Sequence, residues 1–301
     1  MALLLNALIT GISIGAVYGM IAIGYTVVYN ATRVFNLAQG DLLMVGVMIS
    51  YLCLDVMHWP QVLTFFCVIA GVTLLAAFEE RVIVRPFLKK GGNALTLWGA
   101  GIGWFIATLA FSLIIETIAS DLYGDNYPRA IPSIVGAGGW HVGSVTINLR
   151  FFVTIVALII VMIFLELFES RTWLGRAMRA TAQDRDAASL RGIEPSIISF
   201  AAFALGGLVA GIGAFAVAPI TFSDPTIGIN YTLKGFLSLA IGGFGSFRGA
   251  IVGAFCLGIA EQLWDLYVNG SYEIVADLLL LLIVFAVRPT GIFGERRVRT
   301  V

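Results

Sequence analysis

The side chains with the most capacity for chemistry gather in one polar stretch, residues 171–193, within an otherwise apolar chain. Its arginines offer positive charge to a partner; in the middle of the stretch they are Arg176, Arg179, Arg185 and Arg191. Small residues between them keep a helix slim enough to enter a groove; they are Ala177, Ala180, Ala182, Ala187, Ala188 and Gly192. This pattern predicts a surface at which a protein outside the bilayer docks.

Residue types for catalysis and metal binding are sparse. His58 and His141 are the only histidines, and the chain contains neither His-Glu-x-x-His nor Gly-x-Ser-x-Gly. The three cysteines form no Cys-x-x-Cys pair. A phosphate loop of the form Gly-x-x-x-x-Gly-Lys-Ser/Thr is also missing, so the chain cannot hold ATP in that way. We therefore expect no catalytic residue, no metal site and no cofactor in this chain.

The composition requires a membrane to position the polar stretch. Hydrophobic residues make up 59% of the chain, charged residues 12%, and the mean hydropathy is +0.96, which indicates an all-α polytopic membrane protein. Apolar runs of about 20 residues, enough to cross the hydrocarbon core, cover 3–29, 42–57, 62–78, 94–118, 151–168, 197–220, 250–268 and 274–287. The run 233–244 is short and interrupted by glycines, so it is a short span or half of a broken one. We expect nine crossings within one domain, 1–301, with eight or ten as alternatives.

The basic residues predict the orientation. With nine crossings and the N-terminus outside, all but Arg129, Arg150 and Lys234 of the 18 basic residues fall on the cytoplasmic side. The apolar N-terminal segment has no basic residue before Arg33 and no Ala-x-Ala cleavage pattern, so we read it as a retained first helix. The polar stretch then lies in the cytoplasm, and the loop 121–148 lies outside.

Glycines and polar side chains indicate that the membrane domain encloses a path. The 34 glycines favour close helix packing, and ionisable residues at membrane depth are costly. A weak internal echo supports this: 30–39 leads from a glycine-rich helix into a second helix, as 219–230 does later, from opposite sides of the bilayer. The echo predicts an inverted repeat in which the segments 36–40 and 226–234 meet near the path. The candidate path residues are Asn36, Gln39, Gly40, Asp41, Asn230 and Glu261. The alternative is that Asn36, Gln39 and Asp41 only satisfy helix ends.

Four stretches, read together, resemble the permease subunits of the branched-chain (hydrophobic) amino acid ABC importer family, of the Liv type. Residues 36–41 are similar to the family's Asn-Phe-Ala-His-Gly-Glu, with Leu37, Gln39 and Asp41 as departures. Residues 175–184, followed by Gly192, are similar to its coupling loop. The other two are 242–250, with glycines and Glu261 after it, and 288–294. They stand in the family's order and span nearly the whole chain.

The resemblance implies a permease subunit of an ATP-driven importer in the bacterial inner (cytoplasmic) membrane. Its partners would be a second related permease, two cytoplasmic ATP-binding subunits that use ATP and Mg²⁺, a periplasmic substrate-binding protein and membrane lipid, but no nucleic acid. The solute would be a branched-chain or hydrophobic amino acid, or a related amide or carboxylate. The polar stretch 171–193 would be the coupling loop, with contact residues Gly175, Arg176, Arg179, Ala180, Gln183, Asp184, Ala187 and Gly192.

Other classes remain open on the residues alone. An ion- or proton-coupled secondary transporter or channel would explain the spans and the carboxylates Glu116, Glu261 and Asp277, but it leaves the polar stretch unexplained. The stretch could instead be a basic loop held by anionic lipid headgroups. A membrane-embedded enzyme is disfavoured by the lack of catalytic motifs.

Overall fold

The computed structural model describes residues 2–86, 103–124, 128–133, 138–142 and 145–294. Its elements, in chain order, are α1 (Ala2–Thr32), α2 (Gln39–Tyr51) with the π-helical turn η1 (Leu52–Val56), α3 (Gln61–Phe78) with the π-helical turn η2 (Glu79–Val84), α5 (Gly103–Tyr123), β1 (Gly139–Val142), β2 (Val145–Asn148), α6 (Leu149–Arg171), α7 (Trp173–Gln183), α8 (Arg185–Leu190), α9 (Pro195–Thr221), α10 (Ile227–Gly242), α11 (Phe247–Tyr267), the 3₁₀ turn η3 (Gly270–Tyr272) and α12 (Glu273–Val287). The predicted helical membrane fold is confirmed, with one short antiparallel hairpin, β1–β2, between α5 and α6.

Eight helices of the described residues are long and apolar enough to span a membrane. They are α1, α2 with η1, α3 with η2, α5, α6, α9, α11 and α12 with η3. The short span expected at 233–244 is α10, a helix of 16 residues that begins earlier, at Ile227. The first part of the span expected at 94–118 lies outside the described residues, and its described part is α5 from Gly103. Counting α10 together with these eight helices, the described bundle has nine, within the expected range of eight to ten spans.

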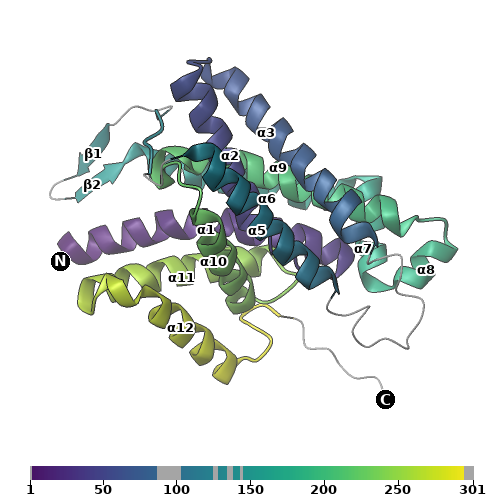
Figure 1. Ribbon diagram of the computed structural model, residues 1–301. Helices are drawn as coiled ribbons and strands as arrows, with labels where there is room; N and C mark the ends of the chain where they lie inside the picture. The colour runs from purple at the N-terminus through teal and green to yellow at the C-terminus, as the bar shows by residue number, and fades with distance from the viewer. Residues whose placement is uncertain (1, 87–102, 125–127, 134–137, 143–144, 295–301) are drawn as a thin grey trace.

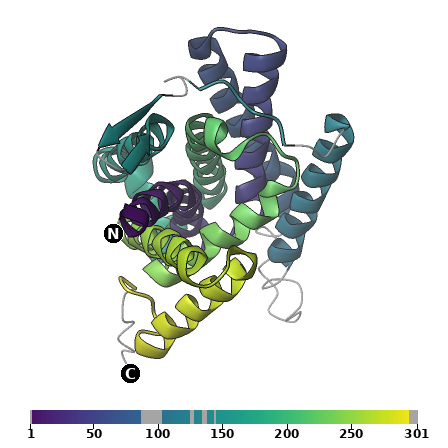
Figure 2. The ribbon, with the colours of Figure 1, turned by 90° about the vertical axis from the view of Figure 1, so that its left-hand side faces the viewer.

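Helix α1 forms the centre of the bundle and packs on α11, α9 and α10 (Figures 1 and 2). Its middle part, from Ala16 to Val28, is buried throughout. Contact with α11 depends on glycine, because a Cβ at Gly258 would lie 2.4 Å from the carbonyl oxygen of Gly11. Between α3 and α9, a Cβ at Gly207 would lie 2.5 Å from the Cβ of Ala76. The glycines thus allow the backbone approach that holds membrane helices together.

The bundle has two distinct ends (Figure 1). One carries α7 and α8 and is called the α7 end; the other carries the start of α1 and the β1–β2 hairpin and is called the hairpin end. Arg33 bonds to α7 at the first end, whereas Arg129 pairs with Ser223 and Arg150 bonds to Pro219 near the end of α9 at the other. These three arginines therefore divide between the ends as the charge pattern predicts. Which end faces the cytoplasm stays a prediction.

Two long helices end in the same unusual way. Arg33, directly after α1, and Phe222, directly after α9, both have φ of 59°, the left-handed region that side chains other than glycine rarely adopt. A linker without regular helix follows each, 33–38 and 222–226, and leads into α2 and α10 respectively. The layout inferred as an echo in the sequence is thus matched by equivalent turns in the structure.

Candidate functional site

The corner between α6 and α7 is fixed by local bonds. The Thr172 hydroxyl accepts a hydrogen bond from the Gly175 backbone N–H at 3.0 Å and donates to the Phe168 carbonyl at 2.7 Å, so it caps the new helix. Gly175 is required because a Cβ there would lie 2.4 Å from the Cα of Glu169. The corner is therefore tight, and α7 is held rigidly against the end of α6.

One face of α7 packs on its own chain. Ala177 and Met178 are buried against Ala31 of α1 and against Ile198 and Ala202 of α9. The prediction that all small residues of this stretch keep the helix slim for a partner therefore needs revision, since Ala177 and Ala188 are buried within this chain. Their small size serves the packing of α7 and α8 on the bundle.

The other face is open. Arg176, Arg179, Gln183, Asp184, Ala187 and Gly192 are exposed, Ala180 is half-buried and Gly175 is buried. The Asp184 carboxylate accepts the Ala187 N–H at 2.9 Å and so starts α8 directly after α7 ends. Arg179 bonds to Glu169 of α6 at 3.3 Å. Two exposed apolar residues of this stretch, Trp173 and Leu190, were not predicted from the sequence; they are 64% and 89% exposed. A large apolar side chain in a polar stretch was the available signal.

Two predicted path residues, Gly40 and Asp41, lie at a buried junction with α10. The hydroxyl of Thr232 donates to the Leu37 carbonyl at 3.2 Å and accepts from the Gly40 N–H at 3.1 Å. Gln39 reaches between α1 and α9, where its amide nitrogen donates to the Gly206 carbonyl at 3.2 Å. Gly24 of α1 leaves the space that this amide fills. The segments 36–40 and 226–234 of the internal repeat therefore do meet.

The carboxyl groups beside the junction are also enclosed. Asn36 donates to Glu79 of η2 at 2.9 Å, and its own oxygen accepts the Ala38 N–H. Asp41 accepts from Ser112 of α5. Asn36, Gln39 and Asp41 are each at most 1% exposed. In the described chain these side chains tie α2 and the linker before it to η2, α5 and α9, and Asn36 also bonds a backbone N–H next to a helix start. Their predicted role in a path is untested.

Glu261 lies in a different place. Its carboxylate accepts from Lys234 of α10 at 2.7 Å and from the Tyr18 hydroxyl at 2.7 Å. Lys234 also pairs with Glu273 at the start of α12, at 3.0 Å. This group joins α1, α10, α11 and α12. Of the predicted path residues, only Asn230 is exposed, one turn into α10.

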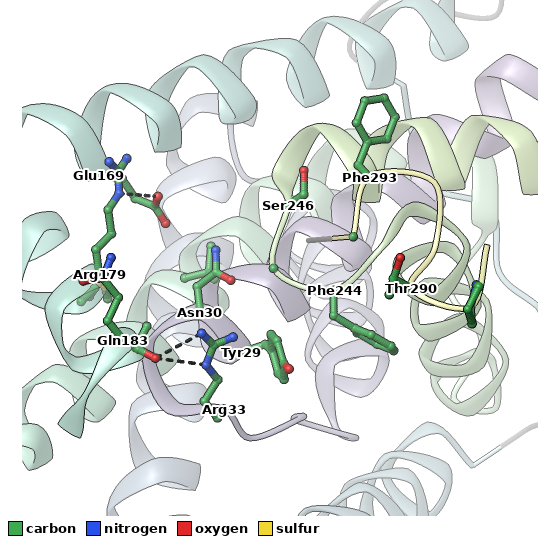
Figure 3. A pocket seen from close by; sticks show the side chains of 16 residues that line it. Tyr29, Asn30, Arg33, Glu169, Arg179, Gln183, Phe244, Ser246, Thr290 and Phe293 are labelled. Atoms are coloured by element: carbon green, nitrogen blue, oxygen red, sulfur yellow. Dashed lines mark hydrogen bonds and ion pairs between the residues drawn. The ribbon is translucent and has the colours of Figure 1, made fainter. Parts of the chain in front are cut away.

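A cavity of about 1320 Å³ opens at the α7 end (Figure 3). On one side lie Glu169, Arg179 and Gln183, and on the other lie Ser246, Thr290 and Phe293. Between the two sides lie Tyr29, Asn30 and Arg33, at the end of α1. Its described lining contains none of the six predicted path residues. Arg179 and Gln183, both predicted coupling residues, do line it.

The far wall of this cavity is built by residues 288–294, the C-terminal strap. The N–H groups of Ile292 and Phe293 donate to the carbonyls of Ile241 and Gly242 at 2.9 and 2.8 Å, so the strap pairs with the otherwise unpaired end of α10. The approach needs glycine, because Gly243 and Gly291 have φ of 103° and 82° and a Cβ at Gly291 would lie 2.6 Å from Gly243. The third and fourth sequence motifs thus form one contact.

The sequence model of the family described as "Branched-chain amino acid transport system / permease component" matches residues 7–287. The chain belongs to this family. The permease is 31% identical to the high-affinity branched-chain amino acid transport system permease protein BraD of Pseudomonas aeruginosa, over 99% of this chain and 98% of the relative. It is 29% identical to the corresponding LivH of Escherichia coli, over 99% and 97%. The solved structure of PsaBC from Streptococcus pneumoniae in complex with Fab aligns with 16% identity and a TM-score of 0.48, covering 97% and 94% of the two chains.

The family assignment confirms the predicted class. The permease is a multi-pass membrane protein and a transport component, and a membrane-embedded enzyme is no longer a candidate. Among the described residues, no group of three or more His, Cys, Asp or Glu is arranged to hold a metal ion. The use of ATP and Mg²⁺ by separate subunits stays a prediction.

Proposed function

We propose that this permease forms one half of the path in an ATP-driven importer of the bacterial inner membrane. A second related permease would form the other half, and a periplasmic binding protein would deliver the solute to the hairpin end. Two cytoplasmic ATP-binding subunits, with ATP and Mg²⁺, would bind at the α7 end. The match to the transport permease family over residues 7–287 carries the proposal.

Coupling through α7 is supported by how the helix is mounted. Its open face offers Arg176, Gln183 and Asp184 to a partner, while its buried face rests on α1 and α9. The tight corner at Thr172 and Gly175 leaves α7 little freedom to move relative to α6. An ATP-binding subunit that contacts α7 differently in its open and closed states would therefore bias the bundle between two arrangements.

The first half of α10 is the best candidate for the path surface. Thr226, Ile229, Asn230 and Leu233 are all exposed and recur at helical spacing, so they form one stripe. An amide in contact with lipid is costly, which favours a protein partner or water over lipid as the neighbour of Asn230. The stripe would then face the second permease across the path.

The proposed solute is a branched-chain or other hydrophobic amino acid, or a related amide or carboxylate. BraD and LivH are named for branched-chain amino acids, so leucine, isoleucine and valine are the first solutes to test. The departures from the family motif, Leu37, Gln39 and Asp41, do not argue against this class, since Gln39 and Asp41 are buried and Leu37 bonds to Thr232 through its backbone.

Uptake into proteoliposomes tests the proposal. The permease is reconstituted with its related permease and ATP-binding subunits, and radiolabelled leucine is supplied with the binding protein. We expect uptake to require ATP and Mg²⁺ and to stop when the ATP-binding subunits are omitted. An imposed proton gradient should not restore it. Uptake driven by the gradient alone would overturn the proposal in favour of a secondary transporter.

A further inference from the structure

Arg33 is a direct link between α7 and the first linker. Its guanidinium Nε and Nη2 donate to the carbonyl oxygen of Ala182, in the last turn of α7, at 3.3 and 3.1 Å (Figure 3). That carbonyl has no partner within α7 because it belongs to the final turn. A cation at this end also interacts favourably with the helix dipole. The bond therefore fixes the free end of α7 to the residue at which α1 turns into the linker 33–38.

The backbone at Arg33 gives no reason for an arginine. Its φ of 59° is costly for any residue with a Cβ and is the conformation for which glycine is best suited. Since the side chain is exposed and bonds to α7, it adds a connection that glycine would lack. Strain at such a position is a reason to look for a function of the side chain.

Aromatic rings continue the connection into the bundle. The guanidinium carbon of Arg33 lies 5.3 Å from the centre of the Tyr29 ring. Tyr29 stacks on Phe35 of the linker with ring centres 4.6 Å apart and an angle of 15°. Phe35 in turn meets Phe236 of α10 and Phe244, at 5.6 and 5.2 Å. A displacement of Arg33 would therefore move rings that touch α10.

The linker itself has little freedom beyond Phe35. Asn36 is bonded to Glu79, and the Leu37 carbonyl and the Gly40 N–H share the hydroxyl of Thr232. Movement at Arg33 can thus be passed to the junction of α2 and α10 through contiguous contacts. The exposed stripe that we assign to the path runs from Thr226 to Leu233, and Leu233 directly follows Thr232.

We propose that Arg33 is a positioning residue that transmits movement of α7 to the linker 33–38 and from there to the junction of α2 and α10. This rests on the proposed function, in which α7 receives the ATP-binding subunit. Arg33 would act on the solute path only through these contacts.

Arg33→Gly separates transmission from stability. The change removes the bond to Ala182 and also relieves the left-handed backbone, so the thermal midpoint in detergent should be unchanged or higher. The ATP-binding subunit should remain bound and hydrolyse ATP, while solute imported per ATP hydrolysed in proteoliposomes falls about tenfold, as expected for loss of a charged hydrogen-bonding group. Arg33→Lys keeps the charge but loses the forked donor, so its solute import per ATP should lie between those of the parent and Arg33→Gly. Arg248→Ala is the matched control, because Arg248 pairs with Glu166 of α6 and should stay within about twofold of the parent.

A double-mutant cycle tests the route through the rings. Tyr29→Leu removes the ring beneath the guanidinium. As a single change it should lower the solute imported per ATP hydrolysed, but combined with Arg33→Gly it should add little further loss. Losses that multiply would overturn the connection. Normal solute import per ATP in Arg33→Gly would also overturn the proposed transmission. Loss of the bound ATP-binding subunit in this variant would overturn it as well, because Arg33 would then be a docking residue. Failure of the proposed function is separate: it would appear as normal subunit binding and transport after Ala187→Trp, whatever Arg33→Gly does.

Discussion

Gly40 and Gly228 pack against each other where the first turns of α2 and α10 meet. A Cβ at Gly40 would lie 2.3 Å from the carbonyl oxygen of Gly228, and a Cβ at Gly228 would lie 2.0 Å from a carboxylate oxygen of Asp41. Each glycine belongs to the equivalent part of one unit of the internal repeat. The two units are therefore joined through backbone at the point where both helices begin.

This contact predicts a strict requirement for glycine. Gly40→Ala and Gly228→Ala should each lower stability by about 1–3 kcal/mol, because an inserted methyl group must displace backbone in a packed interior. The thermal midpoint of the purified permease in detergent measures the effect. Gly138→Ala is the control, since no atom lies within 4 Å of a Cβ there. Equal midpoints for Gly40→Ala and the parent would show that the two units can separate.

Ala187→Trp tests docking at the polar stretch. Ala187 is exposed on α8, so the indole will not disturb the bundle, but it should block entry of this region into a groove of the ATP-binding subunit. We expect normal membrane insertion and loss of the co-purified subunit. Leu122→Trp, at a site 82% exposed on α5, controls for a surface tryptophan. A complex that retains the subunit at full stoichiometry would refute docking at α8.

Single-cysteine labelling tests the orientation. In a background without Cys53, Cys67 and Cys256, Ser189→Cys at the α7 end should be protected from an impermeant maleimide in whole cells. Ser271→Cys, exposed in η3 at the opposite end of α11, should react. Both should react after the cells are opened, which controls for accessibility. The reverse pattern in whole cells would invert the predicted topology.

The ion pair of Lys234 and Glu261 should behave as a unit. Its side chains are 14% and 0% exposed, so Lys234→Met leaves a buried carboxylate without its cation. The single change should cost about 3–5 kcal/mol of stability. Adding Glu261→Gln should recover part of the loss, because the carboxylate that paired with Lys234 is then removed as well. Thermal midpoints of the two single variants and the double variant measure the coupling, and additive losses would show that the pair is not linked.

Asn230→Ala tests the path surface. Removing an exposed amide from α10 should slow uptake or change competition between related solutes, while complex assembly and ATP hydrolysis stay in place. Ile229→Ala, a neighbour on the same stripe, measures the effect of losing size without losing the amide. If uptake and competition by related solutes are unchanged in Asn230→Ala, the path must lie elsewhere on the permease.

The sequence was sufficient for the class and for the layout of the bundle, because apolar length and charge act locally along the chain. The run 233–244 illustrates the limit: its glycines and short length were visible, but α10 begins at Ile227. The start of the helix packs on α2, and hydropathy does not report that contact. The equivalent turns at Arg33 and Phe222 could not be anticipated either, since neither residue is typical of a left-handed conformation.

In the candidate site, too, features of composition were predictable from the sequence, whereas contacts that depend on helix packing were not. The polar stretch 171–193 was identified because its composition differs from everything around it, yet the sequence could not tell which small residues pack inward. Glu261 was grouped with Asn36 and Gln39 as a candidate path residue only because all three are polar residues in or beside spans. Its pairing with Lys234 depends on how α10 and α11 lie together, and residues 27 positions apart carry no signal of that contact. Arg33 was counted only as a charge.

The C-terminal strap has a consequence for the order in which the protein is made. The groups that complete the hydrogen bonds at the end of α10 belong to Ile292 and Phe293, which leave the ribosome only after α11 and α12. Until then the last carbonyls of α10 must be satisfied by water or by transient partners. The cavity wall opposite α7 is therefore among the last parts of the permease to form. A nascent chain halted after α11 would present α7 complete but the opposite wall unfinished. Productive contact with the proposed ATP-binding subunits would then await the strap.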